Sequence, residues 1–170
     1  MKKVKFISAI LIIILIIPGV MACGNRIPRD PSFNFDLKYG VSAKNEIDTF
    51  HDKFTKDMVN DPSITINLRL SKTEMDSIYQ KMLEIDFFSY PDTFTVTTAP
   101  GDAVQVVTPF NTYQFTVEKD SKTKILNWSG EIQNPDDKAA KLRELIFLIK
   151  RIIEAKEEYK ELPDAGSAYL

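Results

Sequence analysis

Apolar side chains occupy every second position between residues 32 and 40, and this pattern constrains the fold more than any other feature of the chain. The apolar positions are Phe33, Phe35, Leu37 and Tyr39. Successive side chains of a strand point to opposite faces, so the pattern predicts a strand with one buried face. The same alternation recurs at 64–70 and at 113–117. Such strands need a sheet whose apolar face is covered by another layer.

The stretch 46–58 fits two structures. Four apolar residues could line one face of a helix: Ile47, Phe50, Phe54 and Met58. Threonines beside aromatic residues suit a hairpin instead, and the preceding strand and turn favour two short strands with a bend at 51–53. The sequence NDPS at 60–63 predicts a turn. Further short strands are expected at 93–98, 104–106 and 123–128.

Two amphipathic stretches predict helices. Ser71 and Glu74 form an S-x-x-E capping box before the first. Its apolar stripe comprises Met75, Ile78, Tyr79, Met82 and Ile85. The second helix should begin with Asn134 as the cap and Pro135 in its first turn, and run to about Glu161. Its stripe comprises Leu142, Leu145, Ile146, Ile149, Ile152 and Ile153.

These elements predict an α+β fold. We expect an antiparallel sheet with two helices packed on one face, in the order strands, helix, strands and long C-terminal helix. Residues 32–163 form a single domain in this interpretation, and 164–170 form a C-terminal tail. We see no internal repeat.

The N-terminal residues have the parts of a secretory signal. Three lysines lie within the first five residues, and Ser8 is the only polar residue in the twelve residues 6–17. A helix of that length reaches about 18 Å, which is shorter than the roughly 30 Å hydrocarbon core of a bilayer. The stretch therefore predicts a signal peptide at 1–22 and not a permanent membrane span.

The stretch Val20-Met21-Ala22-Cys23 resembles the lipobox of bacterial lipoproteins. The resemblance implies cleavage before Cys23 and a diacylglyceryl thioether on its sulfur, which would anchor the chain to the outer face of the cell membrane. Residues 23–31 would then be a flexible tether. The Lys-, Ile- and Asn-rich composition favours a Gram-positive source. In layout alone, the domain resembles uncharacterised bacterial lipoprotein domains, which assigns no residue a role.

The charge balance argues against nucleic-acid binding. The chain has 22 basic and 24 acidic side chains, and three of the lysines belong to residues 1–22. The remainder carries a formal charge of −5, whereas a nucleic-acid partner requires a basic surface. Electrostatic adhesion to anionic lipid is disfavoured for the same reason, so acyl chains would have to hold the protein on the membrane.

No catalytic or metal-binding motif is recognisable. His51 is the only histidine and lies in a charged bend, Cys23 is the only cysteine, and the six glycines are isolated. Five acids lie close together at Glu46, Asp48, Asp52, Asp57 and Asp61; a solvated acidic edge is favoured over a cation site. No cofactor is expected. We therefore predict a non-enzymatic binding module, with a small cell-envelope hydrolase using dispersed carboxylates as the alternative.

Two groups of residues are candidate contacts for a protein, peptide or glycan partner. Phe147 falls on the polar side of the second helix, beside Arg143 and Arg151, a composition typical of interface hot spots. The second group is an aromatic cluster that could form a lip or could close the core, and the core interpretation is favoured. Its members are Phe87, Phe88, Tyr90 and Phe94.

Overall fold

The computed structural model describes residues 32–96, 98, 101, 104–133 and 136–166, and these residues form an α+β domain as predicted. The strands are β1 (Phe33–Val41), β2 (Asn45–Asp48), β3 (Lys53–Met58), β4 (Asp61–Asn67), β5 (Thr93–Phe94), β6 (Gln105–Val106), β7 (Asn111–Lys119), β8 (Lys122–Ser129) and β9 (Ile132–Gln133). Within the described part, seven of them form one large sheet in the order β4-β3-β2-β1-β7-β8-β5.

The alternating strand β1 lies at the centre of this sheet. It pairs antiparallel with β2 and β7, so that Leu37 lies opposite Ile47 on one side and Phe115 on the other. All three side chains are buried. The end of β2 is held by Thr49, whose hydroxyl accepts the Phe35 N–H at 2.8 Å and donates to the Phe35 carbonyl at 2.9 Å. The apolar positions of the sequence pattern therefore become one continuous buried face.

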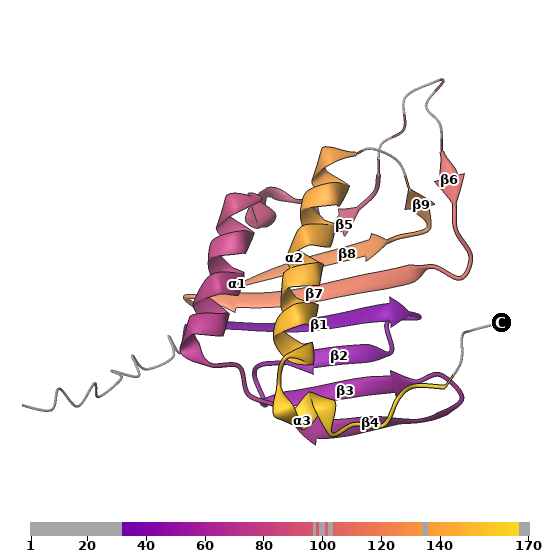
Figure 1. The fold of residues 1–170 in the computed structure, drawn as a ribbon. Helices are drawn as coiled ribbons and strands as arrows, with labels where there is room; N and C mark the ends of the chain where they lie inside the picture. Colours follow the sequence, from indigo (N-terminus) through magenta and orange to yellow (C-terminus); the bar gives the residue numbers. More distant parts are fainter. Residues whose placement is uncertain (1–31, 97, 99–100, 102–103, 134–135, 167–170) are drawn as a thin grey trace, which may run out of the picture.

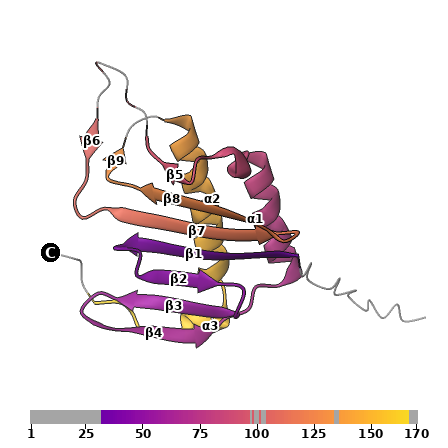
Figure 2. The same cartoon turned by 180° about the vertical axis from the view of Figure 1, so that it is seen from behind.

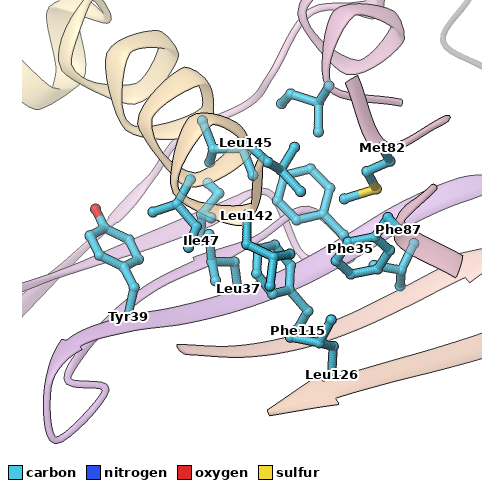
Figure 3. Close-up of a cluster of buried hydrophobic side chains, with 14 of the residues drawn as sticks. Phe35, Leu37, Tyr39, Ile47, Met82, Phe87, Phe115, Leu126, Leu142 and Leu145 are labelled. Carbon is cyan, nitrogen blue, oxygen red and sulfur yellow. The ribbon is translucent and has the colours of Figure 1, made fainter. Parts of the chain in front are cut away.

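Two helices cover that face: α1 (Lys72–Glu84) and α2 (Asp137–Glu154). Figure 1 shows both in front of the sheet, and Figure 2 shows the opposite face without a helix. Leu142 and Leu145 of α2 pack into the core, whereas Tyr39 lies at its side with the hydroxyl pointing away (Figure 3). None of the helices in the described residues has the length and apolar character required to span a bilayer.

The helix boundaries differ from the sequence prediction at α2. The capping box of α1 is present, with the Glu74 N–H donating to Ser71 Oγ at 3.3 Å. The cap of α2, however, is Asp136, whose carboxylate accepts the Ala139 N–H at 2.8 Å; Asn134 and Pro135 lie outside the described residues.

The predicted long terminal helix is also interrupted. It ends at Glu154, Lys156 is extended, and a short helix α3 (Glu157–Lys160) follows. The break turns the chain back over the sheet, where the ring of Tyr159 packs 5.5 Å from that of Phe54. A straight helix could not make this contact, so tertiary packing overrides the helical pattern here.

Several strands also differ from prediction. The hairpin at 46–58 is correct, but β4 begins at Asp61 and ends at Asn67, so NDPS is largely strand. The strand expected at 93–98 is limited to β5, which pairs parallel with β8 and makes the sheet mixed. The strand expected at 104–106 pairs as β6 with β9 in a separate small sheet. A short 3₁₀ helix, η1 (Phe87–Ser89), follows α1.

Candidate functional site

A cleft of about 410 Å³ lies beside the C-terminal half of α2, above the ends of β1, β3 and β7. We call it the tyrosine cleft. Its lining residues are Tyr39, Gly40, Val41, Asn45, Lys56, Asp57, Val59, Asn111, Tyr113, Ile146, Lys150, Glu154, Tyr159 and Ala165. Glu144 pairs with Lys81 of α1 at 2.8 Å and lies about 120° around α2 from Lys150. The cleft therefore occupies the flank of α2 that α1 does not cover.

Three phenols give the cleft its chemical character. Burial raises the pKa of Tyr39, Tyr113 and Tyr159 above the usual value. The negative charge of Glu154 adds to the pKa increase at Tyr39 and at Tyr159. The three side chains therefore remain neutral hydroxyls at physiological pH and can donate hydrogen bonds.

The charged residues of the cleft differ in whether they already bond to other groups of the chain. Lys56 Nζ donates to the Pro163 carbonyl at 2.8 Å and lies 5.0 Å from the centre of the Tyr159 ring. Asp57 is buried, and its Oδ1 accepts the Val59 N–H at 3.0 Å. Lys150, by contrast, has no ion-pair partner in the described part of the chain. Its ammonium group is thus the cation most available to a ligand.

The wall of the cleft formed by β1 and β3 is held by Asn45. Its Oδ1 accepts the Asp57 N–H at 3.0 Å and its Nδ2 donates to the Tyr39 carbonyl at 3.4 Å. Gly40 has a φ of 98°, and a Cβ there would lie 2.7 Å from Asn45 Nδ2. A side chain at position 40 would therefore displace Asn45, so this glycine is required by both conformation and space.

The predicted partner contact lies near this cleft. Phe147 is 62 % exposed, and the Arg151 guanidinium lies 5.8 Å from the centre of its ring. Arg143 instead lies 5.3 Å from the centre of the Trp128 ring. Phe147 is only about 60° around α2 from Lys150, one turn earlier. Phe147 is also about 60° from Glu144, so it lies on the outward side of α2, between the cleft and the flank that faces α1.

The aromatic cluster does not form a lip. Phe87, Tyr90 and Phe94 are buried, and only Phe88 reaches the surface. The Phe87 ring packs 5.2 Å from the Phe115 ring, and the Tyr90 hydroxyl donates to the Lys138 carbonyl at 3.0 Å. These side chains close the core between η1 and the sheet. A second, smaller cavity of about 290 Å³ is lined in part by Phe94 and Trp128.

The five acids predicted as an acidic edge are spread along the sheet. Glu46 lies 3.3 Å from Lys38, Asp52 lies 3.6 Å from Arg69, and Asp48 Oδ2 lies 2.5 Å from the nitrogen Nδ1 of the exposed His51. Asp57 is buried and Asp61 is exposed. No group of three or more metal-ligating side chains occurs among the residues that the structure describes. Cys23, the predicted lipidation site, lies outside them.

The helix-free face of the sheet carries a separate group of three carboxylates, Asp36, Glu46 and Asp48. Asp36 of β1 lies opposite Asp48 of β2, and Glu46 lies one pair further along the same face. Burial and the charge of Glu46 raise the pKa of Asp36 to about 6, with Lys38 partly opposing them. Neither Asp36 nor Glu46 lines either cavity described above.

No known protein family, curated protein or solved structure matches this chain. The candidate site is therefore defined by geometry alone. The sequence interpretation missed Tyr39, Tyr113, Lys150 and Glu154. The two tyrosines stand at apolar positions of alternating strands, and a phenol at such a position is the signal that could have indicated a polar cleft at the edge of the core.

Proposed function

We propose that this protein is a non-enzymatic binding module that holds its ligand in the tyrosine cleft. In this proposal Cys23 carries the lipid anchor, so that the α+β domain, with both helices on one face of its sheet, stands on the extracytoplasmic side of a bacterial cell membrane. The supporting observation is the cleft itself, which is lined by three neutral phenols and by an ammonium group that has no ion-pair partner within the described residues.

The lining favours a peptide segment of a partner protein as the ligand. A cleft of about 410 Å³ falls within the range of roughly 300–1,000 Å³ that is common for binding sites. Tyrosine hydroxyls and the amide of Asn111 can bond to peptide carbonyls, and Lys150 can bond to an acidic side chain. Phe147, about 60° around α2 from Lys150, adds next to the cleft an exposed aromatic side chain of the kind that protein interfaces favour. A glycan could use the same phenols, and the following test separates the two ligands.

A photo-crosslinking amino acid at position 150 or 147, in intact cells, tests the proposal. We expect both positions to capture the same partner protein, and Lys150→Glu to reduce capture from position 147. Gln114 is exposed on the helix-free face of the sheet, so a crosslinker there is the matched control and should capture nothing specific. Equal capture from position 114 would contradict the assignment of the cleft. Capture of a glycan alone would exclude the peptide.

The second candidate, a hydrolase using dispersed carboxylates, is supported by Asp36. A carboxyl group with a pKa of about 6 beside a second carboxylate is suited to general acid–base catalysis. The pair lies on the helix-free sheet face and outside both cavities, and for this reason we favour the binding module. Hydrolysis of a cell-envelope substrate that is abolished by Asp36→Asn in a folded protein would reverse this preference.

A further inference from the structure

Among the described residues, no strand pairs with the outer edge of β4. β4 is an edge strand of the main sheet, and no charged residue lies between Asp61 and Arg69. The opposite edge is β5, which has only two residues. Proteins commonly block long edge strands with charges or keep them short, because unpaired backbone groups invite another strand. The contrast between the two edges indicates that β4 is available for pairing.

The register of β3 and β4 shows which backbone groups face outward. The Leu68 N–H donates to the Asp52 carbonyl at 2.8 Å, and the paired residues continue regularly from there to Ile64. Antiparallel pairs alternate between hydrogen-bonded and non-hydrogen-bonded, so Ile64, Ile66 and Leu68 bond to β3. The N–H and C=O groups of Thr65 and Asn67 therefore point away from the sheet.

Pro62 of β4 does not remove any of the backbone groups that point away from the sheet. Lys56 pairs with Ile64 and Met58 pairs with Asp61, so β4 has one extra residue there relative to β3. Pro62 lies within this irregularity, outside the regular stretch from Ile64 to Leu68. Its missing N–H therefore removes no donor from the open part of the edge.

The side chains of β4 would match those of an added strand on both faces of the sheet. Ile64 and Ile66 are half-buried on the helix-covered face. On the other face the Thr65 hydroxyl lies 2.9 Å from that of Thr55. An added strand with the same alternation would extend both rows, pairing aliphatic side chains on one face and hydroxyl groups on the other.

We infer that the outer edge of β4 pairs with β4 of a second copy of this chain, antiparallel about a two-fold axis at Thr65. Opposite charges flank the open stretch, Asp61 before it and Arg69 after it, and favour this partner and direction; Arg69 also lies 3.6 Å from Asp52 of its own chain. Antiparallel pairing brings Asp61 of each copy towards Arg69 of the other, whereas parallel pairing would bring like charges together. The main sheet then continues from one copy into the next. Pairing through one strand buries little surface, so the dimer is weak and depends on concentration.

Charge substitution near the axis tests this inference in the full-length chain. Thr65 is exposed, and Thr65→Lys or Thr65→Glu brings two like charges together at the axis. In sedimentation equilibrium in density-matched detergent, we expect the native chain to dimerise and each variant alone to associate at least about tenfold more weakly. An equimolar mixture of the two variants should restore the dimer. Gln114→Lys, on the same sheet face but away from the edge, should dimerise like the native chain.

Three results would overturn the inference. They are a native chain that stays monomeric up to about 0.5 mM, a Thr65→Lys variant that dimerises as well as the native chain, and a β4 edge that accepts a foreign peptide strand without self-association. Circular dichroism should show that the variants remain folded. If the Thr65 variants unfold, Arg69→Glu replaces them, because it brings like charges together with Asp61 of the other copy; adding Asp61→Lys to this variant should restore the dimer.

Discussion

Asp36 is held in an environment that disfavours its charge, and this makes the stability of the fold depend on pH. Burial, the charge of Glu46 and, more weakly, that of Asp48 raise the pKa of Asp36 from 3.8 to about 6, while Lys38 opposes them. Its Oδ1 is buried and has no hydrogen-bond partner in the described part of the chain. Between pH 4 and 6 the folded chain therefore binds more protons than the unfolded chain, so the free energy of unfolding falls as the pH rises through this window.

Replacing Asp36 with Asn removes the charge and keeps the shape of the side chain. The pKa change corresponds to at most about 3 kcal/mol, because each pH unit is worth about 1.4 kcal/mol. The side chain is only half-buried, and solvent screening reduces the effect to about 1 kcal/mol. We therefore expect Asp36→Asn to be more stable than the native chain by about 1 kcal/mol at pH 7.5, and equally stable at pH 4.

Urea unfolding at several pH values between 4 and 7.5 measures this difference. A change of about 1 kcal/mol moves the urea midpoint by about 0.5 M for a domain of this size. Glu118→Gln is the matched control, because Glu118 is exposed on the neighbouring strand β7 and on the same sheet face. A midpoint difference that is the same at pH 4 and pH 7.5, or that Glu118→Gln reproduces, would refute the reasoning.

Three further predictions follow from the positions of single side chains. Phe147→Ala should change the free energy of unfolding by less than about 0.5 kcal/mol, whereas Ile149→Ala in the core should cost about 2–5 kcal/mol; a melting temperature lowered equally by both would place Phe147 in the core. Thr49→Val should cost about 1–3 kcal/mol in urea unfolding because it leaves the buried Phe35 N–H without its acceptor, and Thr49→Ser should recover most of this loss. Cys23→Ala should leave an unprocessed chain that incorporates no radiolabelled palmitate, and label in that variant would contradict the proposed anchor.

The parts of the fold that depend on local pattern could be predicted from the sequence. The strand at 33–39 follows from its alternation, and the capping box of Ser71 and Glu74 follows from residues three positions apart. The interruption of the terminal helix after Glu154 could not be predicted, because it is caused by the packing of Tyr159 on a strand about a hundred positions earlier. The parallel pairing of β5 likewise depends on its distant partner β8.

The candidate site was harder to predict for the same reason. The tyrosine cleft combines residues of five separate segments, 39–45, 56–59, 111–113, 146–154 and 159–165, and only its neighbour Phe147 was recognisable from helix periodicity. The pairing of Asp36 with Glu46 and Asp48 requires the register of two strands, and a shift of one residue would place these carboxylates on the opposite face.

Because the chain turns back over the sheet after Glu154, the last described residues line one side of the tyrosine cleft. Lys56 bonds to the Pro163 carbonyl, and the Gly166 N–H donates to the Met58 carbonyl at 3.2 Å. Proteolysis just after Lys156 would therefore remove one side of the cleft and uncover the Phe54 ring in a single step. Any protease or fusion that displaces this segment would open the cleft and expose apolar surface together, so the shape of the cleft and the burial of Phe54 depend on the same ten residues, 157–166.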